Sequence, residues 1–186
     1  VDALEISTKD VVSYYTKMNA KILNIVALSA KLASTQELVK SLDAYTNFLK
    51  SKERAGIERA VLSGVFAKDS FSRATAAKFA SLVSEQNALT NLFLSVSDAN
   101  IQNLYKEIES DASFAEVDKF RAIAESKESN FGVDATIWFK TITKKINKLK
   151  EFEDALAAHT LTLSEDLVSS SFQSLIAVLL STLIVL

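Results

Sequence analysis

The last part of the chain, residues 134–186, reads DATIWFKTITKKINKLKEFEDALAAHTLTLSEDLVSSSFQSLIAVLLSTLIVL and contains neither proline nor glycine. Its branched apolar residues recur at helical intervals of four, three and seven, at Ile142, Ile146, Leu149, Leu156, Leu163 and Leu167. Because nothing interrupts the pattern, it predicts one continuous helix of about fifty residues, about 75 to 80 Å long. A helix of that length indicates an elongated helical protein.

The composition of the chain supports the same fold class. It has 186 residues, 48% of them hydrophobic, with no proline, no cysteine and only three glycines. So few turn-forming residues are atypical of β-sandwiches and barrels, whose hairpins need special backbone angles. The lack of cysteine excludes disulfide scaffolds, thiolate metal sites and cysteine nucleophiles. Length and apolar content therefore favour one helical domain.

Capping signals divide the remaining sequence into further helices. A first long helix carries an apolar heptad stripe at Tyr15, Met18, Ile22, Ile25 and Leu32. The later helices are expected to start at a capping box of Ser34 and Glu37, at Asp69 to Ser72, at Ser97 or Asp98, at a second capping box of Ser113 and Glu116, and at Asp134. Their expected ends are near Ala67, Glu109 and Ser126, with a break at Asn130 to Gly132.

The fold class that follows is all-α, an elongated up-down helical bundle with long first and last helices and four helices between them. Both long helices carry heptad stripes, so we expect them to pair. An antiparallel pairing would bring both ends of the chain to the same end of the bundle.

The tail from Phe172 to Leu186 is apolar and carries no charge over about 15 residues. A membrane-spanning helix needs roughly 20 such residues. We interpret residues 1–171 as a helical ectodomain and residues 172–186 as the start of a truncated transmembrane helix. The alternative is a terminal helix buried against its own bundle or against a dimer partner.

Residues that carry catalysis are scarce. The single histidine, His159, cannot form an imidazole metal cluster, and the carboxylates lie among lysines as on solvated helix faces. There is no phosphate loop, dinucleotide fingerprint or nucleophile elbow. The net charge of −2 gives no general attraction to nucleic acid. We therefore expect no enzymatic activity, no cofactor, no bound metal and no nucleic-acid partner.

Two of the four arginines, Arg54 and Arg59, lie in the stretch KSKERAGIERAVLSGVFA from residue 50 to residue 67, together with Gly56 and Gly64. Glycine inside a helix costs about 1 kcal/mol relative to alanine, so close approach of another helix is the expected reason for it. Arg54 and Arg59 lie on opposite flanks of the glycine face, roughly 140° apart, and cannot both reach one small ligand within a single helix. Either one of them faces a site while the other makes a salt bridge, or two copies of the helix bring their arginines together across a two-fold axis. The simpler interpretation is an ion pair of Arg54 with Glu58 and a rim position for Arg59.

This stretch, with KERAGIERAVLSGVFA at its centre, resembles the signature helix of the NIT family of nitrate- and nitrite-sensing domains, found outside the membrane in bacterial chemoreceptors and histidine kinases. The WF pair, Trp138 and Phe139, resembles that family's second recurrent stretch. The two stretches cover under a third of the chain. The resemblance implies an all-helical ectodomain between two transmembrane helices.

The resemblance also implies a sensor for a small inorganic anion, with Arg54 as a ligand contact beside Gly56 and a second arginine, Arg121 or Arg59, from elsewhere in the bundle. A guanidinium fork can engage two oxygens of planar nitrate at once. The Thr136 hydroxyl, or backbone amides at Asp134 to Thr136, could complete the donors, and Trp138 could wall the site from water.

The leading hypothesis is a sensor domain of a transmembrane receptor, of methyl-accepting chemoreceptor type, that binds nitrate or nitrite. It would be a homodimer anchored in the bacterial inner membrane by its C-terminal helix, with the domain facing the periplasm or exterior. Anion binding between helices or between protomers would displace the last helix. Its rivals are a structural coiled-coil or tail-anchored interaction protein and a lipid carrier.

Overall fold

The computed structural model describes residues 8–185 and contains six helices there, with no strand in that range. They are α1 (Thr8–Leu32), α2 (Gln36–Lys68), α3 (Arg73–Val96), α4 (Ala99–Glu109), α5 (Ala112–Ser126) and α6 (Ala135–Val185). The predicted all-α class is confirmed, as are long first and last helices with four helices between them. The α6 helix has 51 residues, in agreement with the predicted unbroken helix.

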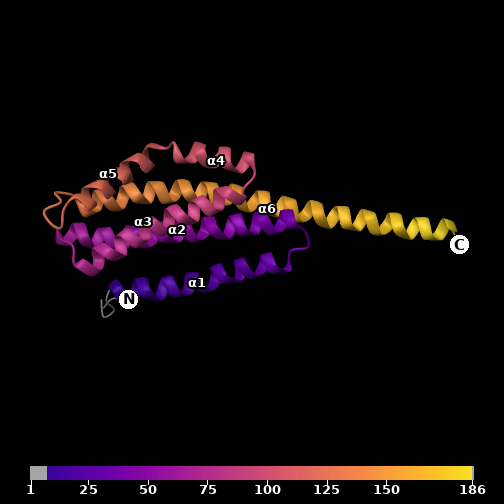
Figure 1. Cartoon of the computed structure of the whole chain (residues 1–186), viewed down its shortest axis with the longest axis horizontal. Coiled ribbons are helices and arrows are strands. Elements are labelled where there is room, and N and C mark those ends of the chain that lie inside the picture. Colours follow the sequence, from indigo (N-terminus) through magenta and orange to yellow (C-terminus); the bar gives the residue numbers. More distant parts are fainter. Residues whose placement is uncertain (1–7, 186) are drawn as a thin grey trace.

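The helices lie side by side in an elongated bundle (Figure 1). The α2 helix is central and packs against α1, α3 and α6, while α4 and α5 follow one another along α6. Figure 1 shows α1 and α6 running in the same direction, with the start of α1 and the end of α6 at opposite ends of the molecule. The predicted antiparallel pairing of the first and last helices is therefore wrong, because α2 provides the packing surface for both.

Side-chain caps set the starts of the helices. The N-cap residues Thr35, Ser72, Asp98 and Asp111 each accept a hydrogen bond from a backbone amide two or three residues later. Two predicted caps are corrected by one or two positions, because Thr35 takes the place of Ser34 and Asp111 that of Ser113. Before α6, the carboxylate of Asp134 accepts from the amides of Thr136 and Ile137, as its predicted capping role requires.

The glycines behave differently from expectation. A Cβ built on Gly56 or Gly64 meets no atom within 4 Å, so the close helix approach predicted at these positions is absent from the described part of the chain. Gly132, with φ of +68°, and Asn130, with φ of +56°, are in the left-handed region. These two residues form the predicted break that separates α5 from α6.

The core consists of two apolar clusters along the bundle axis. One contains an aromatic group of Phe48, Phe93, Tyr105 and Phe152, whose rings meet edge to face. The other contains Trp138 and its neighbours, which are Leu62, Val65, Phe66, Phe79, Val117, Ala124, Phe131 and Ile142. Residues of α2, α3, α5 and α6 contribute to both clusters, so these helices hold the two halves of the core together.

The predicted heptad stripes have different surroundings. On α6, Ile142, Leu149 and Leu156 are buried in the bundle. On α1, the stripe faces outward, with Ile22 53% and Ile25 66% exposed.

The α6 helix continues past the rest of the bundle (Figure 1), and its side chains from Val168 to Val178 are exposed. Within the described residues, no helix has a run of apolar residues long enough to span a membrane.

Candidate functional site

Four helices each place a long polar or charged side chain at a position that their apolar spacing assigns to the core. Glu58 of α2, Gln86 of α3, Arg121 of α5 and Lys145 of α6 are all buried. On α6 the buried series Trp138, Ile142, Lys145, Leu149, Phe152 and Leu156 has alternating intervals of four and three. These four residues, called the polar layer below, separate the two apolar clusters.

Glu58 is the centre of the polar layer and has no exposed surface. Its two carboxylate oxygens accept hydrogen bonds of 2.7 Å from Nε and from Nη2 of Arg121, and Nε2 of Gln86 donates a third of 2.8 Å. An arginine that engages both oxygens of a carboxylate is the arrangement that best compensates the cost of burying the charge. The pair joins α2 to α5.

The guanidinium of Arg121 is held by three acceptor side chains. Besides Glu58, it donates from Nη2 to Gln86 Oε1 at 3.0 Å and from Nη1 to Asp118 Oδ1 at 3.2 Å. Burial by itself would lower the pKa of Arg121, but hydrogen bonds and charge from Glu58 and Asp118 raise it above its ordinary value. The guanidinium is therefore permanently charged and largely saturated with acceptors.

Lys145 has a different environment. Its side chain is 8% exposed, and its Nζ lies 4.9 Å from the centre of the Phe114 ring. Among the described residues, no side chain or carbonyl accepts a hydrogen bond from this ammonium. Burial and the charge of Arg121 lower its pKa to about 8, against the opposite influence of Glu58, Asp118 and Glu109. Lys145 is thus a buried cation that lacks a direct counter-ion.

Three residues of the polar layer, Gln86, Arg121 and Lys145, line a groove of about 840 Å³. One wall is α3, with Asn87, Thr90 and Asn91, and the opposite wall is formed by α4 and α5. Tyr105, whose pKa burial raises to about 12, closes one side as a neutral phenol. The groove gives solvent-borne molecules a route to Lys145.

The arginines of the signature stretch face different helices. Arg54 pairs with Glu85 of α3 and not with Glu58, its predicted partner. Arg59 points toward α6, where Nη1 donates to Thr143 Oγ1 at 3.0 Å and the guanidinium lies 4.9 Å from the centre of the Phe139 ring. The divergence of Arg54 and Arg59 expected from helical geometry is confirmed.

The other predicted ligand contacts also lie away from one another. Trp138 is fully buried and donates its Nε1 hydrogen to the carbonyl of Arg59 at 3.1 Å. Thr136 is exposed at the start of α6, where Asp134 already accepts its amide hydrogen. Gly56 faces open space. Of the predicted contacts, Arg121 lies at the groove, and neither Arg54 nor Arg59 borders it.

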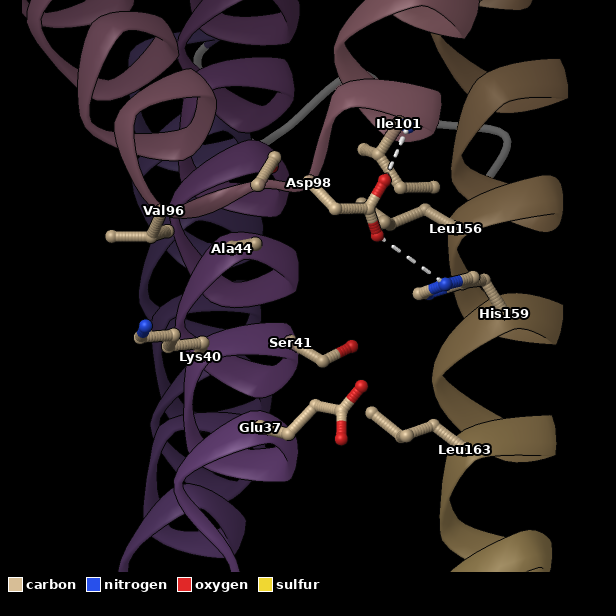
Figure 2. Close-up of a pocket in the computed structure, with 11 residues that line it drawn as sticks. Glu37, Lys40, Ser41, Ala44, Val96, Asp98, Ile101, Leu156, His159 and Leu163 are labelled. Atoms are coloured by element: carbon tan, nitrogen blue, oxygen red, sulfur yellow. Dashed lines mark hydrogen bonds and ion pairs between the residues drawn. The ribbon is translucent and has the colours of Figure 1, made fainter.

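A second cavity of about 120 Å³ lies between α2 and α6, near the start of α4. Figure 2 shows Glu37 and Ser41 of α2 facing Leu163 of α6 across this space. The carboxylate of Asp98 interacts with the backbone amide of Ile101 and with the side chain of His159. The Asp98 Oδ2 atom is 3.5 Å from His159 Nε2. The charged side chains around this cavity are Glu37, Lys40 and Asp98, together with His159.

Sequence reasoning missed Glu58 as a core residue and did not consider Gln86 or Lys145. A signal for them was present, because each occupies a core position in the spacing of its own helix. The signal was weak for Lys145, because its neighbours Lys144, Lys148 and Lys150 make the segment look like a solvated face.

Comparison with known proteins gives one match. No curated protein and no solved structure matches the chain. The model of the NIT family, described as nitrate and nitrite sensing, matches residues 1–161. The match covers all of α1 to α5, the bundled part of α6 and the complete polar layer, far more than the two stretches that first suggested the family. The chain therefore belongs to the NIT family of nitrate- and nitrite-sensing domains.

Proposed function

We propose that this chain is the ligand-binding domain of a bacterial transmembrane receptor, of chemoreceptor type, and that nitrate or nitrite is its ligand. Family membership supports the ligand class. The observation that carries the receptor assignment is α6, a 51-residue helix that belongs to both core clusters and then continues past the bundle. A helix of this kind is suited to carry a change in packing out of the domain.

The proposed signal is a small movement of α6. Residues of α6 contribute Trp138 and Ile142 to one core cluster and Leu149 and Phe152 to the other, with Lys145 between them. An anion bound between the helices would favour one arrangement of these contacts over another. Because packed cores switch between discrete arrangements, a sub-ångström change near the ligand can become a displacement of the whole helix.

The proposed setting is the inner membrane, with the bundle facing the periplasm or exterior. The apolar, uncharged residues 172–186 support membrane attachment through the C-terminal helix. The proposed oligomer is a homodimer, supported by the outward-facing apolar stripe of α1. Domain bounds of 1–171 and 172–186 remain part of this proposal.

The proposed ligand contacts from the sequence are Arg54, Gly56, Arg59, Arg121, Thr136 and Trp138. The side chains of Arg54 and Arg59 have partners on α3 and α6, respectively. Arg54 is the contact that the family resemblance implies, and the Arg54→Ala variant tests it directly. Nitrate affinity equal to that of the unmodified protein would exclude Arg54 as a contact.

The test of the function is calorimetric titration of the purified chain with sodium nitrate and sodium nitrite, with sodium chloride at equal ionic strength as control. Saturable binding of nitrate or nitrite, together with a rise in melting temperature that chloride does not produce, is the expected result. If neither anion binds, the exposed stripe of α1 would instead favour a structural coiled-coil protein without a small ligand.

A further inference from the structure

The groove between α3, α4, α5 and α6 carries charges of both signs on different surfaces. Its carboxylates are exposed to solvent and come from α4 and α5, at Glu109, Asp118 and Glu125. Its cations, Arg121 and Lys145, are buried. Because Arg121 is paired with Glu58, one ammonium and three carboxylates remain. The groove is therefore negative overall, which disfavours a simple anion.

Lys145 lines this groove with hydrogen-bond donors that no acceptor of the described residues engages. Its side chain is only 8% exposed, and its Nζ lies 4.9 Å from the centre of the Phe114 ring, which lines the groove as well. The ring face attracts the charge but leaves the N–H groups without oxygen acceptors. A buried charged donor without an acceptor is costly, and a carboxylate is the acceptor that compensates it best.

The carboxylates of the groove are spread along its length. Asp118 pairs with Arg121, whereas neither Glu109 nor Glu125 forms an ion pair with a residue that the structure describes. The α5 residues that line the groove run from Phe114 to Glu125, which is about 16 Å of helix. The groove is thus long enough for an extended molecule that carries several charges.

We propose that this groove binds a free basic amino acid, whose carboxylate accepts hydrogen bonds from Nζ of Lys145 and whose two cationic groups face the carboxylates of α4 and α5. A ligand of this class carries one negative and two positive charges, so it complements both the buried ammonium and the negative rim. A simple anion would face three carboxylates, and a simple cation would face Lys145. The site adds a second class of ligand to the domain and does not rest on nitrate or nitrite binding.

The remaining lining suits the neutral parts of such a ligand. Asn87 and Asn91 are exposed on the α3 wall, and their amide groups can both donate and accept hydrogen bonds. Apolar side chains also line the groove, namely Val83, Leu94, Phe114 and Leu149. The methylene groups of a basic side chain can pack on this apolar surface while the charged end stays at the rim.

The first experiment varies the charges of the ligand. Calorimetry at pH 7 and constant ionic strength compares L-arginine with L-citrulline, which has a neutral side chain of nearly the same shape, and with agmatine, which lacks the carboxylate. We expect saturable binding of L-arginine to the full unmodified chain and at least tenfold weaker binding of each analogue. L-Glutamate, with its second carboxylate, should bind at least a hundredfold more weakly than L-arginine.

The second experiment varies the cation of the groove. Lys145→Met should weaken L-arginine binding at least tenfold but should not weaken agmatine binding, because agmatine has no carboxylate to lose a partner. The two changes are therefore not additive, as expected for groups in direct contact. Lys144→Met is the matched control, since Lys144 is the adjacent lysine on α6 and is exposed, and it should change L-arginine binding less than twofold.

The third experiment varies the rim. The double variant Glu109→Gln and Glu125→Gln should weaken L-arginine binding at least tenfold. Its control is Glu107→Gln with Glu116→Gln, which removes two exposed carboxylates of α4 and α5 that do not line the groove. The control should change binding less than twofold. Because all four side chains are exposed, both double variants are expected to fold.

Helix content and the fluorescence of Trp138, the single tryptophan, show whether each variant is folded. Absence of L-arginine binding to the folded, unmodified chain would overturn the groove site. Equal weakening of L-arginine and agmatine in Lys145→Met would overturn the contact with Lys145, and L-glutamate binding as tight as that of L-arginine would overturn the charge complementarity. Nitrate and nitrite titrations are separate measurements, so failure of the groove site leaves the sensor function standing, and the reverse.

Discussion

Glu58 and Arg121 are 63 positions apart in the sequence, yet in the fold their side chains meet in two parallel hydrogen bonds of 2.7 Å. The carboxylate is completely buried, and its partner is 9% exposed. This pair fixes α5 against α2 at the level of the polar layer, while Lys145 of α6 contacts the Phe114 ring and forms no ion pair with a residue that the structure describes. The stability and the ligand response of the domain should both depend on this imbalance.

Removing the carboxylate charge should destabilise the domain strongly. In Glu58→Gln, Arg121 keeps only the exposed Asp118 as a charged partner, and loss of one partner of a buried ion pair costs about 3–5 kcal/mol. Urea unfolding followed by the fluorescence of Trp138 measures the free energy of unfolding. The matched control is Glu85→Gln, which breaks the half-exposed Arg54–Glu85 pair and should cost at most about 1 kcal/mol. Equal losses in the two variants would contradict a special role for Glu58.

Replacing the unpaired cation should have the opposite effect. Lys145→Met keeps the volume at the core position and removes the buried charge, so the ligand-free domain should gain about 1–3 kcal/mol at neutral pH. Urea unfolding in ligand-free buffer provides the measurement, with Lys144→Met expected to change stability by less than about 0.5 kcal/mol. A loss of stability in Lys145→Met would show that packing or an ion pair in solution, and not ligand binding, accounts for the lysine.

The stability difference between the unmodified protein and Lys145→Met should shrink at alkaline pH. The folded-state pKa of Lys145, about 8, lies below its ordinary value of 10.5. Below pH 8 the lysine is protonated in both states and its burial cost is fully present. Between about pH 8 and 10.5 the unfolded chain binds more protons than the folded protein, so the free energy of unfolding rises with pH.

The groups that face Lys145 are Glu58 on α2, Glu109 on α4, and Asp118 and Arg121 on α5. Both proteins contain them, so subtracting one stability profile from the other isolates the lysine. Urea titrations at pH 6.5, 8, 9 and 10 provide the comparison. A difference that stays constant over this range would mean that Lys145 keeps its ordinary pKa in the fold.

The apolar stripe of α1 should mediate self-association. Met18, Ile22 and Ile25 are exposed on the face of α1 that points away from the bundle. The double variant Ile22→Lys and Ile25→Lys should convert a dimer into a monomer while leaving the helix content unchanged, because both side chains are exposed. Light scattering on a sizing column measures the mass. A monomeric unmodified protein, or a variant that remains dimeric, would contradict this role for α1.

Helix positions could be predicted from the sequence because they depend on local interactions. The apolar intervals of α6, the break at Asn130 to Gly132 and the capping carboxylates each act within a few residues along the chain. Two cap residues were misassigned by one or two positions, Ser34 for Thr35 and Ser113 for Asp111. The family could also be identified from the sequence, since its signature lies within one helix.

The orientation of α1 relative to α6 could not be predicted, because identical heptad stripes allow either direction and either partner. The role of Gly56 was also misjudged, since a helical glycine can face open space as readily as another helix. Arg54 has two carboxylates within reach, Glu58 in its own helix and Glu85 in the next. Its partner was decided by Arg121, which takes Glu58 from a distant part of the sequence.

The sequence by itself determined an all-helical chain of the NIT family, with six helices whose bounds follow from caps and apolar spacing. It also placed a long polar or charged side chain at a core position in each of α2, α3, α5 and α6. Only the tertiary structure brought Glu58, Gln86, Arg121 and Lys145 to one level, where Arg121 pairs with Glu58 and Lys145 contacts the Phe114 ring. The reason is that charge compensation depends on distances between helices, which helical periodicity within one segment does not specify.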